Sequence, residues 1–176
     1  MNFSELAKER RSVRGFTSQP VSDDVVRQML EAAIQAPSGG NCQPWHFYVI
    51  RDRSVIDKIH ERSYRSGWFP TAQVVFVVCL DAGRSAASYG ERGELLYCIQ
   101  DTGAAIQNML LCAKSLGADT CWCGAFDEVA IVEILDLPSH LRPVALIPTG
   151  YSAKNNPKPG RRLMSEVVTF VGDLGE

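Results

Sequence analysis

The run Val74-Val75-Phe76-Val77-Val78-Cys79-Leu80 is the longest strongly apolar stretch of the chain and carries no charge. Its unbroken, largely β-branched character predicts a buried central strand, because a strand covered on both faces has no polar alternation. Outward from it, strands are expected at 47–50 and 144–147, with weaker candidates at 121–123 and 167–171. With helices expected between these strands, the pattern predicts a mixed α+β layer structure.

Helical periodicity predicts helices over 3–11, 22–36, 53–65, 92–116 and 128–135. Asn2 or Ser4 is expected to cap the first, Ser22 the second and Asp127 the last, and Gly117 is expected to stop the longest. The 92–116 helix is apolar on more sides than a surface helix needs, which a dimer interface would explain. Residues 81–90 carry no clear structural signal, and 155–160 is expected to form an extended, exposed arm.

Bulk properties predict one domain spanning residues 1–176. Apolar residues make up 45% and charged residues 22% of the chain, which is typical of a soluble protein. A net charge of −2 argues against general nucleic-acid binding. We expect no membrane partner, because no apolar run approaches the length of a bilayer span. With no export signal at the N-terminus and six cysteines expected as reduced thiols, we predict a cytoplasmic protein.

Two polar segments flank the helix expected at 22–36. Arg10-Arg11-Ser12-Val13-Arg14 gathers guanidinium and hydroxyl groups suited to a phosphate. Pro37-Ser38-Gly39-Gly40-Asn41-Cys42-Gln43-Pro44-Trp45 is a glycine-bearing turn whose backbone can approach a flat ligand closely. Each segment could instead be an ordinary solvated helix end or loop. Together they favour a bound phosphorylated cofactor.

These segments and three later ones resemble the nitroreductase family of FMN-dependent oxidoreductases. The later matches are Gln107-Asn108-Met109-Leu110-Leu111-Cys112-Ala113, then Leu116-Gly117-Ala118-Asp119-Thr120-Cys121-Trp122-Cys123-Gly124-Ala125-Phe126, and Pro148-Thr149-Gly150-Tyr151 with Arg161 in the tail. Each motif is weak alone, but their order and spacing extend through nearly the whole chain. The resemblance implies a central, mostly antiparallel sheet flanked by helices, a long central helix and an intertwined homodimer.

The same resemblance implies a role for each matching position. Arg10 and Ser12, with Arg11 beside them, would hold the FMN phosphate and ribityl chain, and Arg161 or its neighbour Arg162 would close over the phosphate. Arg14 would lie at the pyrimidine edge, where it would stabilise negative charge on the reduced flavin. The remaining cofactor-binding positions lie on two segments: Trp122, Cys123, Gly124 and Ala125 beside the ring, with the Gly124 amide near N5, and Pro37, Ser38, Gly39, Asn41 and Gln43 approaching from the partner subunit.

The resemblance also implies the reaction. NADH or NADPH would reduce FMN by hydride transfer, and a nitroaromatic, quinone or similar electron-poor acceptor would then be reduced in a ping-pong cycle. No acid–base triad is needed, because the flavin carries the redox chemistry. Flavin destruction, dehalogenation and enal or semialdehyde reduction remain open on the same scaffold, as does a non-catalytic flavin-binding protein.

The cysteines allow two competing interpretations. Cys121 and Cys123 would share one face of a strand and could begin a metal site with Cys98 or Cys112. Structural zinc usually shows paired Cys-x-x-Cys spacing, which is absent, so no metal is predicted and buried thiols are favoured. Cys42 with His46 could suggest a thiol nucleophile, but the flavin interpretation already accounts for the neighbouring residues.

Overall fold

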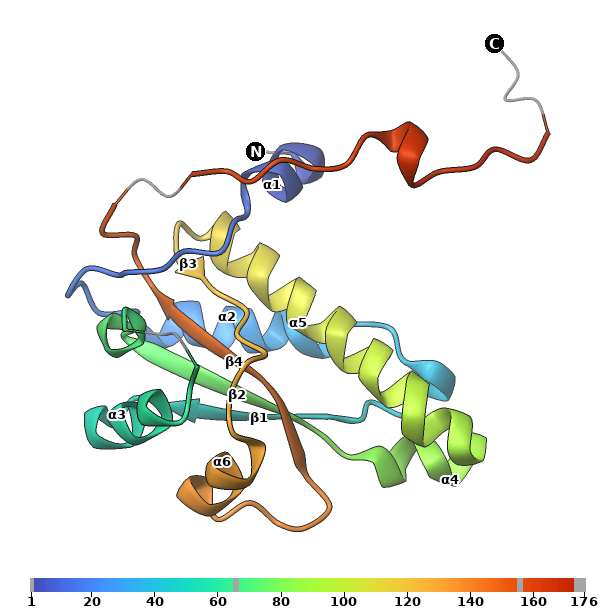
Figure 1. The fold of residues 1–176 in the computed structure, drawn as a ribbon, viewed down its shortest axis with the longest axis horizontal. Helices are drawn as coiled ribbons and strands as arrows, with labels where there is room; N and C mark the ends of the chain where they lie inside the picture. Colours follow the sequence, from blue (N-terminus) through green and yellow to red (C-terminus); the bar gives the residue numbers. More distant parts are fainter. Residues whose placement is uncertain (1, 65–66, 155–156, 173–176) are drawn as a thin grey trace.

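A computed structural model describes residues 2–64, 67–154 and 157–172. Its sheet has the order β1-β2-β4-β3, and every pair of neighbouring strands is antiparallel (Figure 1). The strands are β1 (Trp45–Ile50), β2 (Val74–Leu80), β3 (Asp119–Thr120) and β4 (Arg142–Gly150). The predicted antiparallel sheet is confirmed, with β2 buried along its whole length between β1 and β4.

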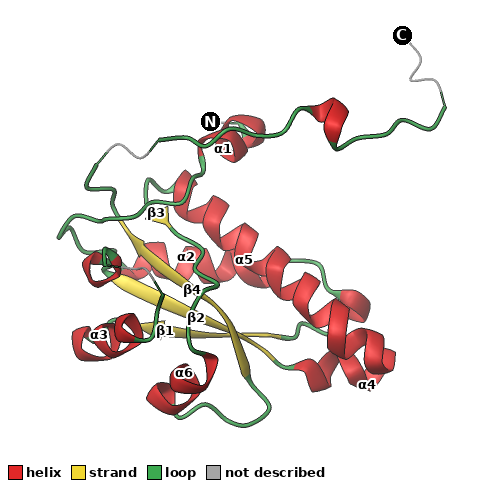
Figure 2. Ribbon diagram, viewed as in Figure 1, coloured by secondary structure: helices red, strands yellow, loops and turns green. Residues whose placement is uncertain are grey.

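Helices cover both faces of this sheet (Figure 2). Alternate residues of β2 point to opposite sides. Phe76 and its even-numbered neighbours pack with α2 (Asp23–Ile34) and α5 (Cys98–Ser115). Val77 and its odd-numbered neighbours pack with α3 (Arg53–Glu61) and α6 (Glu128–Leu135). The continuous apolar run is therefore explained by two cores, one on each face.

The predicted caps are confirmed. The side chains of Asn2, Ser22 and Asp127 accept backbone N–H groups at the starts of α1 (Phe3–Glu9), α2 and α6. Gly117, with φ +80°, follows the end of α5, where a left-handed residue is commonly required.

The long helix predicted over 92–116 is confirmed in extent, but its first turn is π-helical rather than α-helical. α4 (Ala82–Arg92) covers the segment that carried no sequence signal, a π-helical turn spans Gly93–Tyr97, and α5 begins only at Cys98. Gly90, with φ +55°, breaks the helical path just before the π turn. Three other helices are shorter than predicted, because the chain leaves the helix at Arg10, Gln35 and Arg62.

Two predicted strands are also corrected. Residues 167–171 form no strand; they follow a 3-10 turn (Met164–Glu166) on an exposed tail that leads away from the sheet (Figure 1). In the 121–123 segment, only Cys123 makes an isolated bridge, to Leu146, because regular pairing stops at Thr120. Of the predicted arm, residues 157–160 are exposed and Asn155 and Asn156 lie outside the described residues.

Gly93 permits a tight crossing between the π turn and α4, and Gly93→Ala should destabilise the fold. A methyl group there would overlap the backbone carbonyl of Ser85. Overpacking of this kind costs about 1–3 kcal/mol, and a backbone atom cannot rotate away as a side chain can. Urea unfolding measures the loss. Gly83→Ala on the same helix is the control, since its methyl group would meet only the Asp81 carboxylate; equal losses from both variants would contradict the argument.

Candidate functional site

The residues after α1 run in an extended path beside β3. The Val13 amide donates to the Thr120 carbonyl at 2.9 Å, and Ser12 makes a parallel bridge with the same residue. Val13 is buried in the core. Because side chains alternate along extended backbone, Ser12 and Arg14 face the other way, toward solvent and the C-terminal tail.

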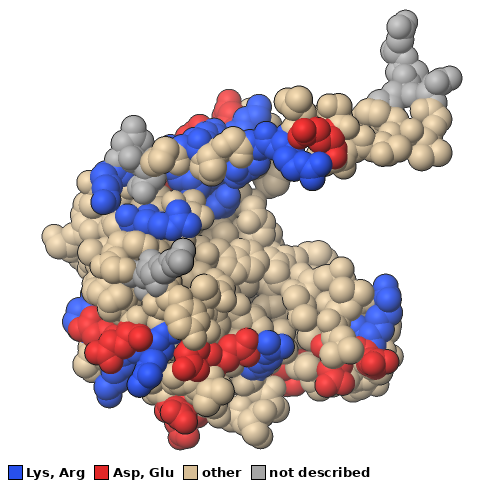
Figure 3. All heavy atoms as spheres, viewed as in Figure 1, with Lys and Arg blue, Asp and Glu red and all other residues tan. Residues whose placement is uncertain are grey.

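Ser12 and Arg14 belong to a cavity of about 390 Å³, here called the arginine hollow. Its lining consists of Arg10, Arg11, Ser12, Arg14, Pro157, Pro159 and Arg161. An ion pair of 3.5 Å between Lys158 and Glu9 ties the tail to α1 and brings Arg161 to this cavity. Figure 3 shows Lys and Arg side chains gathered over this side of the molecule. The arrangement creates a strongly positive concave surface.

The arginines of this hollow differ in their partners. Arg11 pairs with Glu9 at 3.5 Å, and Arg161 donates to the carbonyls of Pro159 and Gly160. The half-buried Arg10 guanidinium has no carboxylate partner among residues 2–64, 67–154 and 157–172. Arg162 lies outside the lining and pairs with Glu166 at 3.7 Å. Of the two tail arginines, Arg161 is thus the one at the hollow.

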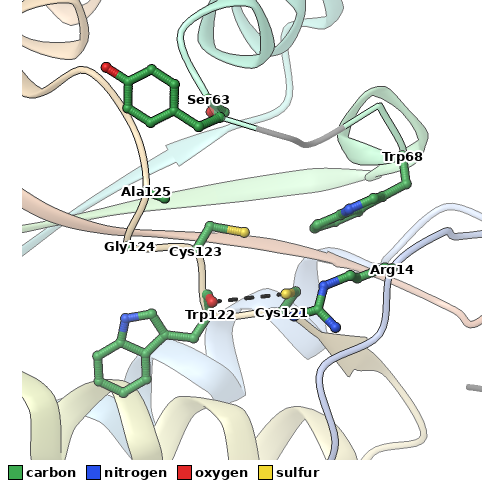
Figure 4. Close-up of a pocket in the computed structure, with 9 residues that line it drawn as sticks. Arg14, Ser63, Trp68, Cys121, Trp122, Cys123, Gly124 and Ala125 are labelled. Atoms are coloured by element: carbon green, nitrogen blue, oxygen red, sulfur yellow. Dashed lines mark hydrogen bonds between the residues drawn. The ribbon is translucent and has the colours of Figure 1, made fainter. Parts of the chain in front are cut away.

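A second cavity, of about 250 Å³ and here called the thiol hollow, also includes Arg14. Its other lining residues are Ser63, Tyr64, Trp68, Cys121, Trp122, Cys123, Gly124 and Ala125. Figure 4 shows the 121–125 segment along one side and Trp68 across from it, with the Arg14 guanidinium next to the Cys121 thiol. Because Arg14 lines both cavities, they meet at that residue.

Within the described residues, the backbone amides of residues 121–125 are hydrogen-bonded on one side only. The Cys121 and Cys123 amides donate to Pro148 and Leu146 of β4 at 3.1 and 2.9 Å. By alternation the Trp122 and Gly124 amides point away from β4, and within the described residues they donate to no protein acceptor. A Cβ built on Gly124 would meet nothing within 4 Å. This segment therefore offers free donors beside open space.

These features fit the FMN that the sequence resemblance implies. The arginine hollow supplies an unpaired cation and a hydroxyl for a phosphate. The adjoining thiol hollow supplies free backbone donors and an indole for a flat heteroaromatic ring. Arg14 lies where the two hollows meet. A residue that contacts the edge of the ring nearest the phosphate chain would occupy this position.

The second predicted segment, residues 37–45, lies away from the two hollows in the structure. Ser38 precedes a 3-10 turn (Gly39–Asn41), and the Gly39 amide donates to Asp101 at 3.1 Å in the first turn of α5. β3, which contacts Ser12, adjoins the opposite end of this helix. An 18-residue helix is about 27 Å long. One chain thus does not bring Pro37, Ser38, Gly39, Asn41 or Gln43 to the two hollows.

Asp101 positions this glycine turn, and Asp101→Ala should release it. Burial raises the pKa of Asp101, while the hydrogen bond from Gly39 opposes that rise. Losing a bond between a backbone amide and a carboxylate costs about 1.5–3 kcal/mol. We expect urea unfolding to show a loss near the lower limit, because Asp101 is only half-buried. Asp57→Ala, at an exposed pair on α3, should change stability by less than about 0.5 kcal/mol; a comparable loss there would refute the positioning role.

Sequence reasoning missed one side of the thiol hollow. Ser63, Tyr64 and Trp68 come from the segment after α3, part of which was predicted to be helical. The aromatic pair Trp68-Phe69 was the available signal, and such a pair resembles ordinary core. Trp122, which the resemblance places beside the ring, is 42% exposed.

The competing interpretations of the cysteines gain no support. No cluster of three or more His, Cys, Asp or Glu side chains suited to a metal occurs in the described part of the chain. The Cys42 thiol contacts Ser88 at 3.8 Å, whereas His46 lies against Tyr48. Within the described segments no helix is both long and apolar enough to span a bilayer.

Comparison with known proteins gives consistent results. The family model described as "Nitroreductase family" matches residues 7–68 and 60–151. A relative from Archaeoglobus fulgidus, whose name pairs NADH dehydrogenase with NAD(P)H nitroreductase, is 35% identical over 81% of this chain and 80% of its own. The FMN reductase [NAD(P)H] of Bacillus subtilis is 26% identical, covering 87% of this chain and 67% of its own. The crystal structure of a nitroreductase family protein from Clostridium difficile 630 superposes with a TM-score of 0.84 at 30% identity, covering 97% and 98% of the two chains.

Proposed function

Because this chain belongs to the nitroreductase family, and is therefore an NAD(P)H-dependent oxidoreductase that carries FMN, we propose that it reduces nitroaromatics, quinones or similar electron-poor acceptors in a ping-pong cycle. The observation that carries the proposal is the meeting of two cavities at Arg14, one lined by arginines and the other by free backbone donors. Residues 1–176 would act as one FMN-binding domain.

Each cavity has its own task in this proposal. Arg10, Arg11, Ser12 and Arg161 hold the phosphate and ribityl chain through charge-assisted hydrogen bonds. FMN supplies the chemistry when bound, accepting a hydride from NADH or NADPH and passing the electron pair to the acceptor. Arg14 and the Gly124 amide hold charge that develops on the ring during reduction. No side chain of the protein is required to carry the hydride.

Tyr64 and Trp68 are the groups we assign to the acceptor side. They lie on the segment after α3, opposite the 121–125 segment, and Tyr64 is 65% exposed. A planar, electron-poor acceptor stacks favourably on aromatic side chains. Because Trp68 also packs edge-on against Phe16, its indole is held by the core and can limit the width of the opening.

We propose that two copies of the chain complete the site. The turn Gly39–Asn41 lies at the other end of α5 from the arginine hollow, so it would reach the flavin of a partner subunit. Leu95 and Ile99, near the start of α5, are 61% and 50% exposed. The tail adds more exposed apolar residues for a partner to cover: Leu163, Met164, Val167, Val168, Phe170 and Val171. We also assign the protein to the cytoplasm, where its six free cysteines would stay reduced.

A visible absorption spectrum followed by anaerobic addition of NADH or NADPH tests the function. We expect a yellow protein, or one that turns yellow on adding FMN, whose flavin absorbance is bleached by the nucleotide and restored by a nitroaromatic or quinone. Initial rates at several acceptor concentrations should give parallel double-reciprocal lines, as a ping-pong cycle requires. A colourless protein that takes up no FMN contradicts the proposal, and bleaching without restoration by any acceptor indicates a non-catalytic flavin protein.

A further inference from the structure

Two thiols lie side by side in the thiol hollow. Cys121 and Cys123 are both anchored to β4 through their backbone amides, so the residue between them faces the other way. Figure 4 shows both sulfurs on the side of Arg14 and Trp68, whereas the Trp122 indole points away from them. Cys121 is 2% exposed, and Cys123 is half-buried. The pair thus lines the hollow in which we place the flavin ring.

The surroundings favour one thiolate in this pair. A hydrogen bond with Cys123 lowers the pKa of Cys121 to about 7 against the effect of burial, and the Arg14 charge, a hydrogen bond with Ser12 and the Arg10 charge act in the same direction. The hydrogen bond with Cys121 and burial raise the pKa of Cys123, so the pair releases one proton easily and keeps the other. By contrast, burial alone raises the pKa of Cys79, in the core, to about 12.

We propose that Cys121 and Cys123 are a redox-active dithiol that exchanges an electron pair with FMN in the same hollow. The inference rests on the proposed FMN site. In the oxidising direction, both Sγ–H bonds are lost, one Sγ–Sγ bond forms, and two electrons and two protons pass to oxidised FMN. Dioxygen or the electron-poor acceptor then reoxidises the flavin. In the other direction, flavin reduced by NAD(P)H returns the electron pair, and with two protons both thiols re-form.

The backbone geometry permits the bond. Residues two apart along an extended segment are about 6.4–6.8 Å apart at Cα, which lies at the upper limit of the range that a disulfide can bridge. Their side chains project from the same face, so side-chain rotation brings the sulfurs together, but the backbone between them must also bend to bring the Cβ atoms within the roughly 3.5–4.5 Å that a disulfide requires. A disulfide at this limit is readily reduced, as an internal electron carrier must be.

The test maps the thiols with and without FMN. The protein is reduced, freed of reductant and divided into FMN-free and FMN-loaded samples. Both are exposed to air, alkylated under denaturing conditions and digested with trypsin, and the peptides are weighed. Residues 115–154 form one peptide whose only cysteines are Cys121 and Cys123. We expect this peptide to be two hydrogens lighter and unalkylated in the FMN-loaded sample alone. Anaerobic NADH or NADPH should restore both alkylation sites.

Electron counting gives a second readout. Anaerobic titration of the aerated, FMN-loaded protein should consume twice as much NADH per bound flavin as Cys123→Ser or Cys121→Ser, which have no second thiol to store a pair. Cys112→Ser is the matched control, because this thiol lies on α5 outside both hollows. It should keep the full response. Normalising to bound flavin removes any effect of the variants on FMN binding.

Two results would contradict the proposal that Cys121 and Cys123 are a redox-active dithiol. One is a peptide whose two thiols remain alkylated in every sample. The other is a disulfide that forms equally without FMN, or that persists after the flavin has been reduced. Flavin absorbance separates this from failure of the proposed function. If neither NADH nor NADPH bleaches the flavin, that function fails; photochemical reduction of bound FMN then replaces the nucleotide, and the thiol map still gives an answer.

Discussion

Gly124→Val should abolish tight FMN binding while leaving the FMN-free fold intact. In the chain alone, a Cβ at Gly124 meets nothing within 4 Å, so the protein itself has room for a larger side chain. That room is where we place the flavin. Overpacking there and displacement of the Gly124 amide together should cost about 3 kcal/mol, or roughly a hundredfold in affinity. Quenching of FMN fluorescence during titration measures the affinity, and thermal unfolding of the FMN-free protein measures the fold.

A matched variant separates ligand contact from a general effect of valine. Gly83→Val introduces the same side chain at an exposed glycine on α4, outside both hollows, and should bind FMN as wild type does. Gly124→Ala should fall between wild type and Gly124→Val. If Gly124→Val retains wild-type affinity, the 121–125 segment does not adjoin the flavin, and the ring must be placed elsewhere along the hollows.

The sheet was predictable because one apolar run dominates it. Val74–Leu80 has no polar position, and only a strand with helices on both faces satisfies seven consecutive buried residues. Helix starts were predictable for a similar local reason: Ser22 and Asp127 bind the first free amides of their helices through their own side chains. Where a few neighbouring residues determine the outcome, the sequence was sufficient.

Other parts depend on contacts between distant residues. α4 begins without a side-chain cap, and Gly93 lets the π turn that follows it pack on Ser85, a contact that composition does not predict. The 167–171 segment has strand-like residues, but the chain leaves the sheet before it and the segment has no strand to pair with. The strand predicted there from its β-branched residues therefore does not form.

The candidate site divides in the same way. Arg10, Ser12 and Gly124 could be named from motifs, and the structure places them around two adjoining hollows. Trp68 and Tyr64 could not, because only the path of the chain after α3 brings them across from Gly124. The thiol pair was visible in the sequence as Cys-x-Cys, but its significance required the neighbouring Arg14.

Arg10→Ala should weaken FMN binding about ten- to a hundredfold and barely change stability. Arg10 is the C-cap of α1 and half-buried, yet no carboxylate of the described chain pairs with it. A half-buried guanidinium in a positive hollow lacks a counter-charge, which a phosphate would supply through bonds worth about 1.5–3 kcal/mol. Because Arg10 pairs with no acid in the described part of the chain, its removal should cost folding little. Titration with FMN should therefore show the loss, and titration with riboflavin, which lacks the phosphate, should show almost none.

Arg162→Ala is the control that makes this result specific. Arg162 carries the same charge on the same side of the molecule but pairs with Glu166 and lies outside the hollow. A phosphate contact predicts that only Arg10→Ala loses affinity and that the difference persists at high salt. A general positive field predicts that both variants lose affinity slightly and that salt removes the effect. If Arg10→Ala and wild type bind FMN with equal affinity, Arg10 does not contact the phosphate. Arg11, Arg14 or Arg161 would then bind the phosphate instead.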